Sequence, residues 1–501
     1  MKFPILKLVG ITKSFDDDFT LSDINLSLFP GEVHVLIGEN GSGKSTIMNI
    51  ISGIVKANSG EILINNNKVS IHSIVSSKQH GILYLMQDSN YFNNLTVAEN
   101  VFLDQMPFTN KFSKVIDYNK LFFKCQELFN TLNIFIDVRE KVSKLGLAER
   151  HLIEFARASI SDAKIAIFDE PSAALTKVER DILFSIIQSL KEKGVGIFYI
   201  SHRLDEIKLI GDRVTIISNG HIVETRDLSS MENDDIIKIM TGAIYKKKYP
   251  KLHVPFGPVV FSVKNLYSPT MLNNISFDLR KNEIIGITGL MGSGRTRLAH
   301  CIFGATKPTA GTISIDEKPV VFNSPSDAIA HGIAFVPEDR AADSIFEYLD
   351  VVSNVTVSSL KRFTRFGKLH TLMVGGLAKD YIKKLNINPG FSYDLLTSYS
   401  GGNQQKVVLA KWMMSRSKIF ILDEPTRGID VVSKIDIYNS MNDLVTKGAS
   451  IIFISSDIDE ILGMCDRILV LSHGRIVCEL SSLEATKEKI LHYATLDSND
   501  I

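Results

Sequence analysis

The sequence predicts an α/β fold made of two similar domains in tandem. Glycine-rich loops that connect a β-rich segment to a helical one begin at Gly38 and at Gly289, 251 residues apart. Apolar segments that end in an Asp-Glu pair place their aspartates at Asp169 and Asp423, 254 residues apart. Two different motifs that recur at nearly the same spacing are typical of a tandem duplication.

The composition is that of a globular protein with two or more domains. Of 501 residues, 45% are hydrophobic and 22% are charged, and 56 Lys and Arg balance 56 Asp and Glu. This balance gives no overall field that would favour nucleic acid or an anionic membrane surface. The four cysteines are not spaced like metal ligands or disulfide partners, so we expect the protein to lie in a reducing cytoplasm. No apolar run reaches about 18 residues and no signal peptide begins the chain, so we expect a protein that neither spans a membrane nor is secreted.

The first glycine-rich loop fits the phosphate-binding loop of nucleotide-binding proteins. Residues 33–37 are expected to form a buried strand before it, and the apolar spacing after it predicts a helix. In such a loop backbone N–H groups surround phosphates, the Lys44 ammonium adds positive charge and the Ser45 hydroxyl can bind Mg²⁺. The predicted nucleotide-binding residues are Gly38, Glu39, Asn40, Gly41, Ser42, Gly43, Lys44, Ser45 and Thr46.

Three other predicted strands supply candidate catalytic groups. The strand at 165–170 ends in Asp169, a candidate Mg²⁺ ligand through water, and Glu170, which is placed to orient and deprotonate an attacking water. The strand at 196–201 is followed by His202, whose ring can reach a γ-phosphate. The strand at 81–87 ends in Gln87, whose amide can contact Mg²⁺-bound water and an incoming partner.

The region before the first loop predicts antiparallel strands. Residues 6–11 and 24–29 alternate in polarity, and we expect them beside the strand that leads into the loop. Phe15 lies upstream of the loop, where it could stack on adenine, although a core or edge aromatic explains it equally well.

The repeat defines the domain boundaries. Prolines and a lysine triplet interrupt any regular pattern before residue 258. We therefore expect a first domain at residues 1–242, a linker at 243–258 and a second domain at 259–501. The lysine triplet at 246–248 is interpreted as part of a solvated connector.

The chain resembles ATP-binding cassette ATPases over essentially its whole length. The segment from Tyr399 to Lys406, Tyr-Ser-Gly-Gly-Asn-Gln-Gln-Lys, resembles the signature loop of that family. Together with Glu338-Asp339-Arg340 and the segment from Asp423 to Asp430, it resembles the fused double-cassette subunits of ribose, galactose and xylose importers. This resemblance implies two tandem ATP-binding cassette (P-loop NTPase) domains, each with a mixed sheet core, an antiparallel β edge and an α-helical subdomain.

In that family two cassettes pack head to tail, and each nucleotide lies between one phosphate loop and the other cassette's signature. The first site would then join the first loop, Gln87, Asp169, Glu170 and His202 to the intact signature. The second site would have Arg295 for the loop lysine, Glu338 near the expected glutamine and Ser456 for the histidine, facing a degenerate signature at 145–151. The remaining cofactor-binding residues that the resemblance implies are Gly289, Gly292, Gly294, Arg295, Thr296, Ser400, Gly401, Gly402 and Gln404.

The resemblance therefore implies one site that hydrolyses ATP and one that mainly binds it, with ATP and Mg²⁺ as ligands. It also implies a peripheral subunit at the cytoplasmic face of the membrane, bound to two permease copies that receive sugar from an extracytoplasmic binding protein. The segments 87–94 and 338–344 are the expected permease-docking surfaces.

Two alternatives remain open. One is a soluble tandem-cassette ATPase that acts on ribosomes or nucleic-acid machinery, a class that usually has two intact signatures and a long charged linker. The short linker, the degenerate signature and the net charge of zero argue against it. The other is a nucleotide-binding regulator without turnover, which the complete first site disfavours. The identity of the sugar is not encoded in the motifs, because specificity belongs to the binding protein and the permease.

Overall fold

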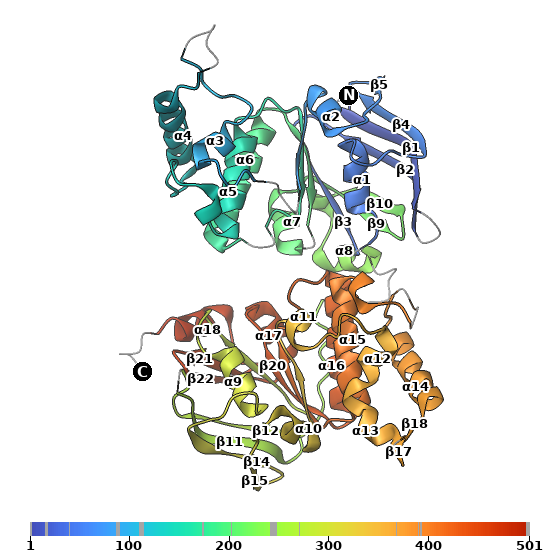
Figure 1. Ribbon diagram of the computed structural model, residues 1–501, viewed down its shortest axis with the longest axis vertical. Coiled ribbons are helices and arrows are strands. Elements are labelled where there is room, and N and C mark those ends of the chain that lie inside the picture. The colour runs from blue at the N-terminus through green and yellow to red at the C-terminus, as the bar shows by residue number, and fades with distance from the viewer. Residues whose placement is uncertain are drawn as a thin grey trace. The chain divides into compact units, whose positions relative to one another are not determined.

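The chain forms two compact units, residues 1–244 and 245–501, and each is described by itself (Figure 1). The computed structural model describes residues 3–15, 19–39, 41–86, 91–109, 115–172, 175–201, 203–240, 248–269, 271–366, 368–388, 390 and 393–496.

The first unit contains two sheets. The four-stranded antiparallel sheet has the order β2-β1-β4-β5, and the six-stranded sheet has the order β10-β9-β3-β8-β7-β6, parallel except for the edge strand β10. The strands are β1 (Leu6–Phe15), β2 (Phe19–Leu28), β3 (Val33–Gly38), β4 (Ser59–Ile64), β5 (Asn67–Val69), β6 (Ile82–Leu85), β7 (Ile165–Asp169), β8 (Gly196–Ile200), β9 (Arg213–Ser218) and β10 (His221–Asp227). Strands β3, β7 and β8 are buried at every residue, as expected for a parallel sheet covered on both faces.

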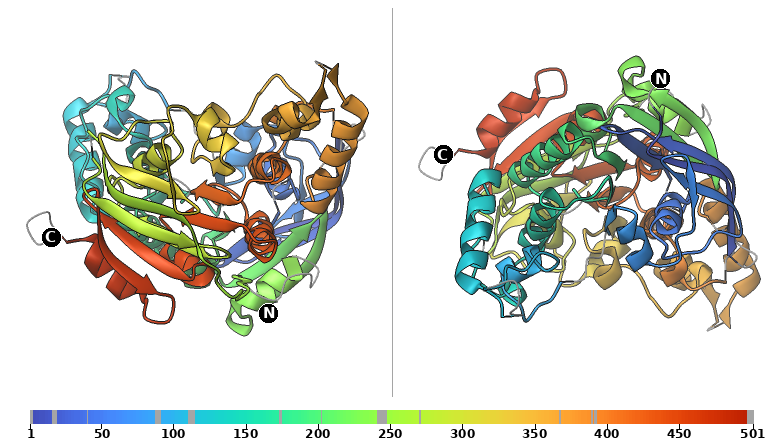
Figure 2. Two further views of the ribbon diagram at one scale, coloured as in Figure 1. Left: turned by 90° about the horizontal axis from the view of Figure 1, so that it is seen from below. Right: turned by 90° about the horizontal axis from the view of Figure 1, so that it is seen from above.

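Helices α1 and α4 lie in different parts of the first unit. Helix α1 packs between the two sheets, where Ile47, Ile50 and Ile51 join one core cluster with residues of both. Helix α4 lies at the opposite end of the unit from β1 and β2 in every view (Figures 1 and 2). The helices are α1 (Lys44–Ile51), α2 (Ile74–Gln79), α3 (Val97–Val101), α4 (Tyr118–Leu132), α5 (Leu147–Ser159), α6 (Lys177–Glu192), α7 (Leu204–Ile210) and α8 (Asn233–Met240), with 3₁₀ turns η1 (Val142–Lys144) and η2 (Leu228–Ser230).

The second unit repeats this arrangement and adds a short hairpin. Its sheets have the orders β12-β11-β14-β15 and β16-β19-β20-β13-β21-β22, and β17 pairs with β18. The strands are β11 (Val259–Tyr267), β12 (Ile275–Arg280), β13 (Ile284–Gly289), β14 (Ala310–Ile315), β15 (Lys318–Val320), β16 (Ile333–Val336), β17 (Thr364–Arg365), β18 (Lys368–Leu369), β19 (Ile419–Asp423), β20 (Ser450–Ile454), β21 (Arg467–Ser472) and β22 (Arg475–Ser481). The helices are α9 (Arg295–Ile302), α10 (Pro325–Ala330), α11 (Arg340–Asp343), α12 (Val351–Thr356), α13 (Leu360–Phe363), α14 (Thr371–Lys384), α15 (Gly401–Met414), α16 (Val431–Thr446), α17 (Ile458–Met464) and α18 (Lys487–Ala494), with 3₁₀ turns η3 (Val357–Ser359) and η4 (Leu396–Ser398).

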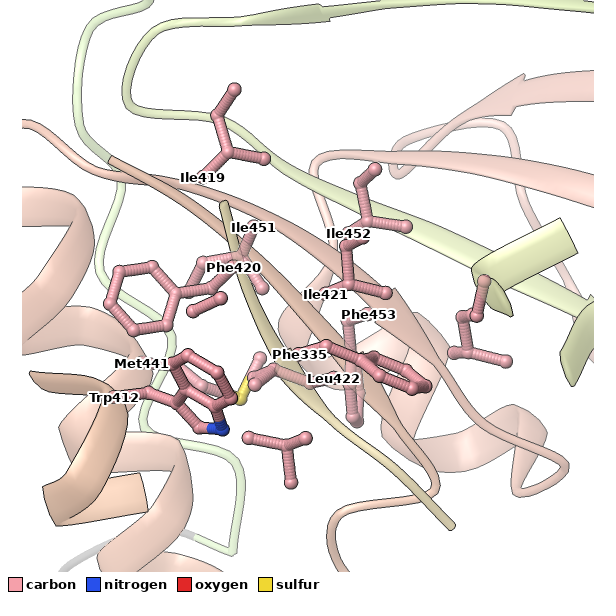
Figure 3. Close-up of a cluster of buried hydrophobic side chains, with 14 of the residues drawn as sticks. Phe335, Trp412, Ile419, Phe420, Ile421, Leu422, Met441, Ile451, Ile452 and Phe453 are labelled. Carbon is pink, nitrogen blue, oxygen red and sulfur yellow. The ribbon is translucent and has the colours of Figure 1, made fainter. Parts of the chain in front are cut away.

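The core of the second unit shows how the helices cover the six-stranded sheet. Phe420 and Leu422 of β19 lie on the face that meets Trp412 of α15 and Met441 of α16 (Figure 3). Successive residues of a strand point to opposite faces, so Ile421 lies on the other side of the sheet. Burial of both faces anchors β19 and thereby the carboxylates that follow it.

Two expectations about local structure differ from the fold. The segments 6–11 and 24–29 do pair antiparallel, but in the separate four-stranded sheet, because β8 and β9 occupy both sides of β3. The described part of the expected linker packs on the second unit: Lys251 Nζ lies 2.8 Å from an Asp466 carboxylate oxygen, and both side chains are buried. None of the helices in the described ranges is both long and apolar enough to span a bilayer.

Candidate nucleotide-binding sites

The loop between β3 and α1 has the geometry of an anion cradle. Gly41 and Gly43 have φ angles of 80° and 106°, a region that side chains disfavour. A Cβ on Gly38 would lie 2.2 Å from the Ile217 carbonyl oxygen, so the close approach of β9 requires glycine there. Among the described residues no side chain caps α1, and its first turn has no acidic residue. The first N–H groups of α1 therefore point at a site for an anion.

Lys44 lies folded across this loop. Its Nζ donates hydrogen bonds to the carbonyl oxygens of Gly38 at 3.0 Å and Glu39 at 2.8 Å. The side chain is buried. The ammonium is therefore held beside the cradle, where it can turn to a phosphate.

The carboxylates at the end of β7 lie beside the loop. Burial raises the pKa of Asp169 and the charge of Glu170 adds to this, whereas the Ser45 hydroxyl, the Tyr84 hydroxyl and the Lys44 charge oppose it. Tyr84 OH donates to Asp169 Oδ2 at 3.1 Å. Glu170 has a φ of 48°, and its N–H donates to the Ile200 carbonyl at 3.0 Å. The structure thus brings four predicted site residues together, and the residue after the strand adopts a left-handed backbone that turns its side chain.

Three predicted site residues, Asn40, Gln87 and His202, lie outside the described residues. Their neighbours are described: β6 ends at Leu85 and β8 ends at Ile200, on either side of β7.

The corresponding loop of the second unit has the same backbone but a different contact. Gly292 and Gly294 have φ angles of 84° and 104°, and a Cβ on Gly289 would lie 2.2 Å from the Leu471 carbonyl oxygen. Arg295, which replaces the lysine, places Nη1 3.0 Å from Glu424 Oε1. The second loop therefore directs its cation at the carboxylate that would serve as a base.

Glu424 has further donors. The Ser456 N–H donates to Oε1 at 2.7 Å and the Ser456 hydroxyl to Oε2 at 3.2 Å. Burial raises the pKa of Glu424, while Arg295 and Ser456 lower it, and the net shift is upward. Both Glu424 oxygens are thus occupied within the second unit.

Asp423 lies beside this group with its carboxylate buried. Burial raises the pKa of Asp423 to about 6, against the opposing effects of the Thr296 hydroxyl and the Arg295 charge. Thr296 lies close enough to act on this pKa, but neither Asp423 oxygen has a hydrogen-bond partner among the described residues. An unpartnered buried carboxylate at the end of a strand is a site that a cation would satisfy.

The intact signature opens helix α15. Ser400 is its N-cap and accepts a hydrogen bond from the Asn403 N–H, and no acidic residue lies in the first turn. A Cβ on Gly401 would lie 2.5 Å from Arg340 Nη2, and a Cβ on Gly402 would lie 2.3 Å from the Ser433 hydroxyl. Gln404 accepts from Arg340 Nε at 3.3 Å. Ser433 therefore requires glycine at position 402, whereas the end of the Arg340 side chain could move away from a Cβ on Gly401.

The degenerate signature of the first unit has a different N-terminus. Helix α5 has Gly146 as its N-cap, and Glu149 Oε2 accepts the Gly146 N–H at 2.8 Å. A carboxylate thus lies at the N-terminus of this helix, where its charge opposes an anion.

The segment 338–344 of the second unit joins the carboxylate loop to the signature helix. Glu338 forms an ion pair with Arg427, which follows Glu424 by three residues. At the other end, the Ser344 carbonyl accepts from the buried Lys411 Nζ at 2.9 Å. Burial lowers the pKa of Lys411 to about 8. Glu338, which lies near the position expected for a glutamine, is therefore also held by the Arg427 cation.

Sequence reasoning missed Tyr84, Glu149 and the contacts of Arg340. Tyr84 occupies an ordinary strand position, and no local pattern indicates its hydroxyl contact. Glu149 is three residues after Gly146, a spacing that does indicate N-terminal capping. Phe15 is exposed at the end of β1, with Lys13 Nζ 5.0 Å from its ring centroid, so it is not a core aromatic.

Comparisons with known proteins identify the family. The family model for ABC transporters matches residues 21–173 and 272–427. The ribose import ATP-binding protein RbsA of Clostridium perfringens (strain 13) is 42% identical over 494 residues, which cover 98% of each chain. A putative ribose/galactose/methyl galactoside import ATP-binding protein of Agrobacterium fabrum is 37% identical over 98% of this chain and 96% of its own length.

A solved structure shows the same fold. The structure of the RNase-L Inhibitor aligns over 95% of this chain and 90% of that chain, with a TM-score of 0.61 and 17% identity. At this identity the likeness shows the fold alone. The two matched segments and the relatives above lead to one conclusion: the chain belongs to the ABC transporter family and is an ATPase with two ATP-binding cassettes.

Proposed function

We propose that this protein hydrolyses ATP to drive the import of a simple sugar through a membrane permease. The names of the relatives support a simple sugar as the transported substrate. One name gives ribose import, and the other gives import of ribose, galactose and methyl galactoside. The observation that carries the proposal is the gathering of Lys44, Ser45, Asp169 and Glu170 at one strand edge of the first unit. Ribose, galactose, xylose, a nucleoside and a furanose-like signalling molecule all stay open as the ligand, since permease and binding protein select it.

The first unit fits a magnesium nucleotide. The uncapped N–H groups of α1 and the ammonium of Lys44 suit phosphates, and the Ser45 hydroxyl adjoins the buried Asp169 carboxylate. Mg²⁺, when bound, would be held by Ser45, Asp169 and Gln87 and would neutralise phosphate charge.

The residues of this site divide the chemistry of hydrolysis among them. Lys44 leaves the two loop carbonyls and pairs with the β- and γ-phosphates. Glu170 orients a water and accepts its proton as the water oxygen bonds to the γ-phosphorus and the bond to the bridging oxygen breaks. His202 contacts the γ-phosphate and stabilises the charge that develops there.

The intact signature would complete this site. Ser400 and the N–H groups of Gly401 and Gly402 suit the γ-phosphate, because α15 begins with a neutral cap. Following the family's head-to-tail pairing, we propose that ATP brings this signature to the first phosphate loop and that hydrolysis releases it.

The second site is proposed to bind nucleotide with little turnover. Glu424 is paired with Arg295 and bonded to Ser456, so it is not available to deprotonate water. Ser456 cannot supply an imidazole contact, and Glu149 disfavours phosphate at the degenerate signature.

The proposed partners are two permease copies at the cytoplasmic face of the membrane and, through them, an extracytoplasmic sugar-binding protein. The docking surfaces are 87–94 and 338–344. The second of these reaches both Arg427 and the signature helix, so permease movement would act on both. A nucleic-acid partner is not supported, because the net charge is zero.

Purification of a tagged full-length chain from membranes of its native cell tests the partners. A polytopic permease identified by mass spectrometry supports import. Recovery from the soluble fraction with ribosomal proteins contradicts it and favours the ribosome-associated alternative.

Paired variants test the asymmetry of the sites. We expect Glu170→Gln to lower ATP hydrolysis about a hundredfold, or about 2.7 kcal/mol of activation free energy, and the matched Glu424→Gln to keep most of it. Equal losses would contradict the asymmetry, and full activity in Glu170→Gln would point to a different base. If the unaltered chain hydrolyses no ATP, alone or with its permease, the result would favour the alternative of a nucleotide-binding regulator without turnover.

A further inference from the structure

A buried carboxylate lies next to the proposed catalytic loops of the first unit. Glu206, on α7, is 1% exposed. Its Oε2 accepts hydrogen bonds from Ser172 Oγ at 2.6 Å, Tyr199 OH at 3.1 Å and Ser201 Oγ at 3.3 Å. Its Oε1 faces Arg203 Nε at 3.1 Å and Arg180 Nη1 at 3.5 Å. We call these six residues the Glu206 cluster.

The cluster joins the two loops that carry candidate catalytic groups. Ser172 follows Glu170 by two residues, and Ser201 and Arg203 stand on either side of position 202. The strands before these loops, β7 and β8, are neighbours in the sheet, and the Glu170 N–H already donates to Ile200. One carboxylate therefore ties the loop after β7 to the loop after β8.

The second unit repeats this cluster at a spacing of 254 residues. Glu460, also 1% exposed, accepts from Thr426 Oγ1 at 2.6 Å and Ser455 Oγ at 3.0 Å, and it pairs with Lys434 Nζ at 2.7 Å. Three partners keep their chemistry: a hydroxyl after the carboxylate pair, a serine hydroxyl before position 202 or 456, and a cation on α6 or α16. The other two differ, because Phe453 and Asp457 stand where the first unit has Tyr199 and Arg203. We call Glu460, Thr426, Ser455 and Lys434 the Glu460 cluster.

A contribution to stability alone does not explain this carboxylate well. A buried charge is costly to desolvate, and apolar residues of similar size often stabilise a core as much. What a multiply bonded carboxylate adds is a fixed geometry, because its acceptors must meet several donors at once. A displacement of about 1 Å at a catalytic group can cost about a hundredfold in rate.

We propose that Glu206 is a positioning residue for ATP hydrolysis, which holds the loop after Glu170 in register with the residues that flank position 202. It acts through Ser172, Ser201 and Arg203, which it contacts directly. This proposal rests on the proposed function, because it takes the first unit as the hydrolytic site.

The test compares Glu206→Gln with Glu460→Gln in the full-length chain. Each variant keeps the side-chain volume and removes the charge of the corresponding buried carboxylate, and the melting temperature of each variant is measured as the control for stability. For Glu206→Gln we expect kcat at saturating Mg-ATP to fall tenfold or more, with ATP affinity changed less than threefold. For Glu460→Gln we expect kcat to fall no more than about threefold.

Milder variants keep the test informative if Glu206→Gln fails to fold. Ser172→Ala and Thr426→Ala each remove the shortest hydroxyl contact of one cluster. We expect a several-fold loss of kcat from the first and little from the second, and partial retention of kcat in Glu206→Asp.

Equal losses of kcat in each matched pair would overturn the proposal and leave a stability role only. Full kcat in a folded Glu206→Gln would overturn it as well. Failure of the proposed function is distinguishable, because Glu170→Gln would then retain hydrolysis whatever the Glu206 variants do.

Discussion

Replacing Arg295 by methionine removes the cation that faces Glu424 in the second unit. The two atoms lie 3.0 Å apart, and the side chains are only 13% and 9% exposed, so the pair is largely shielded from water. Loss of one partner of a buried ion pair typically costs about 3–5 kcal/mol, because the remaining charge stays buried. Ser456 still donates two hydrogen bonds to Glu424. We therefore expect a loss at the lower end of that range, about 3 kcal/mol.

Differential scanning calorimetry of the full-length chain measures this loss. One kcal/mol shifts the melting temperature of a domain of this size by about 2–4 °C, so we expect a fall of about 6–12 °C in the transition of the second unit. Glu424→Gln should also destabilise that unit, since it leaves Arg295 without its anion. The double variant Arg295→Met, Glu424→Gln should recover part of the loss, because neither charge is left unpaired.

Two results would refute this reasoning. An unchanged transition in Arg295→Met would mean that the pair contributes nothing to the folded unit. Strict additivity in the double variant would mean that the two side chains do not interact in solution.

Three further predictions concern single contacts. Gly402→Ala should lower ATP hydrolysis at least tenfold, because its Cβ would lie 2.3 Å from the Ser433 hydroxyl, and the loss should be smaller in a Ser433→Gly background, as steady-state assays of both would show. Asp423→Asn should raise the melting temperature at pH 7.5, because it removes a buried charge whose raised pKa of about 6 costs up to about 3 kcal/mol there. This cost begins to fall as pH drops below the folded pKa and is lost only below the unfolded pKa, so scans near pH 5 should show a smaller difference. Tyr84→Phe removes a hydrogen bond that lowers the pKa of Asp169, so the acid limb of the pH profile of hydrolysis should move to higher pH; an unmoved limb would mean that Asp169 does not set it.

Local sequence patterns predicted several residues that lie together at the proposed nucleotide site. A phosphate loop needs closely spaced glycines, a lysine and a serine, and the apolar strand before Asp169 explains why that carboxylate lies at the edge of a buried sheet. The partition of the first strands into a separate sheet was not predictable, because it depends on β8 and β9 filling both sides of β3. The docking of Lys251 against Asp466 was missed for the same reason, since the partners are 215 residues apart.

The sequence by itself determined the family, the duplication and the residue differences between the two halves, since these are properties of residue type and spacing. Only the tertiary structure decided what those differences do: Arg295 could have pointed to a phosphate site, and it instead pairs with Glu424, 129 residues away. It also decided why Gly402 must be small, and which groups surround Glu206 and Glu460. Such contacts depend on the packing of distant strands and helices, and side-chain direction and burial do not follow from spacing along the chain.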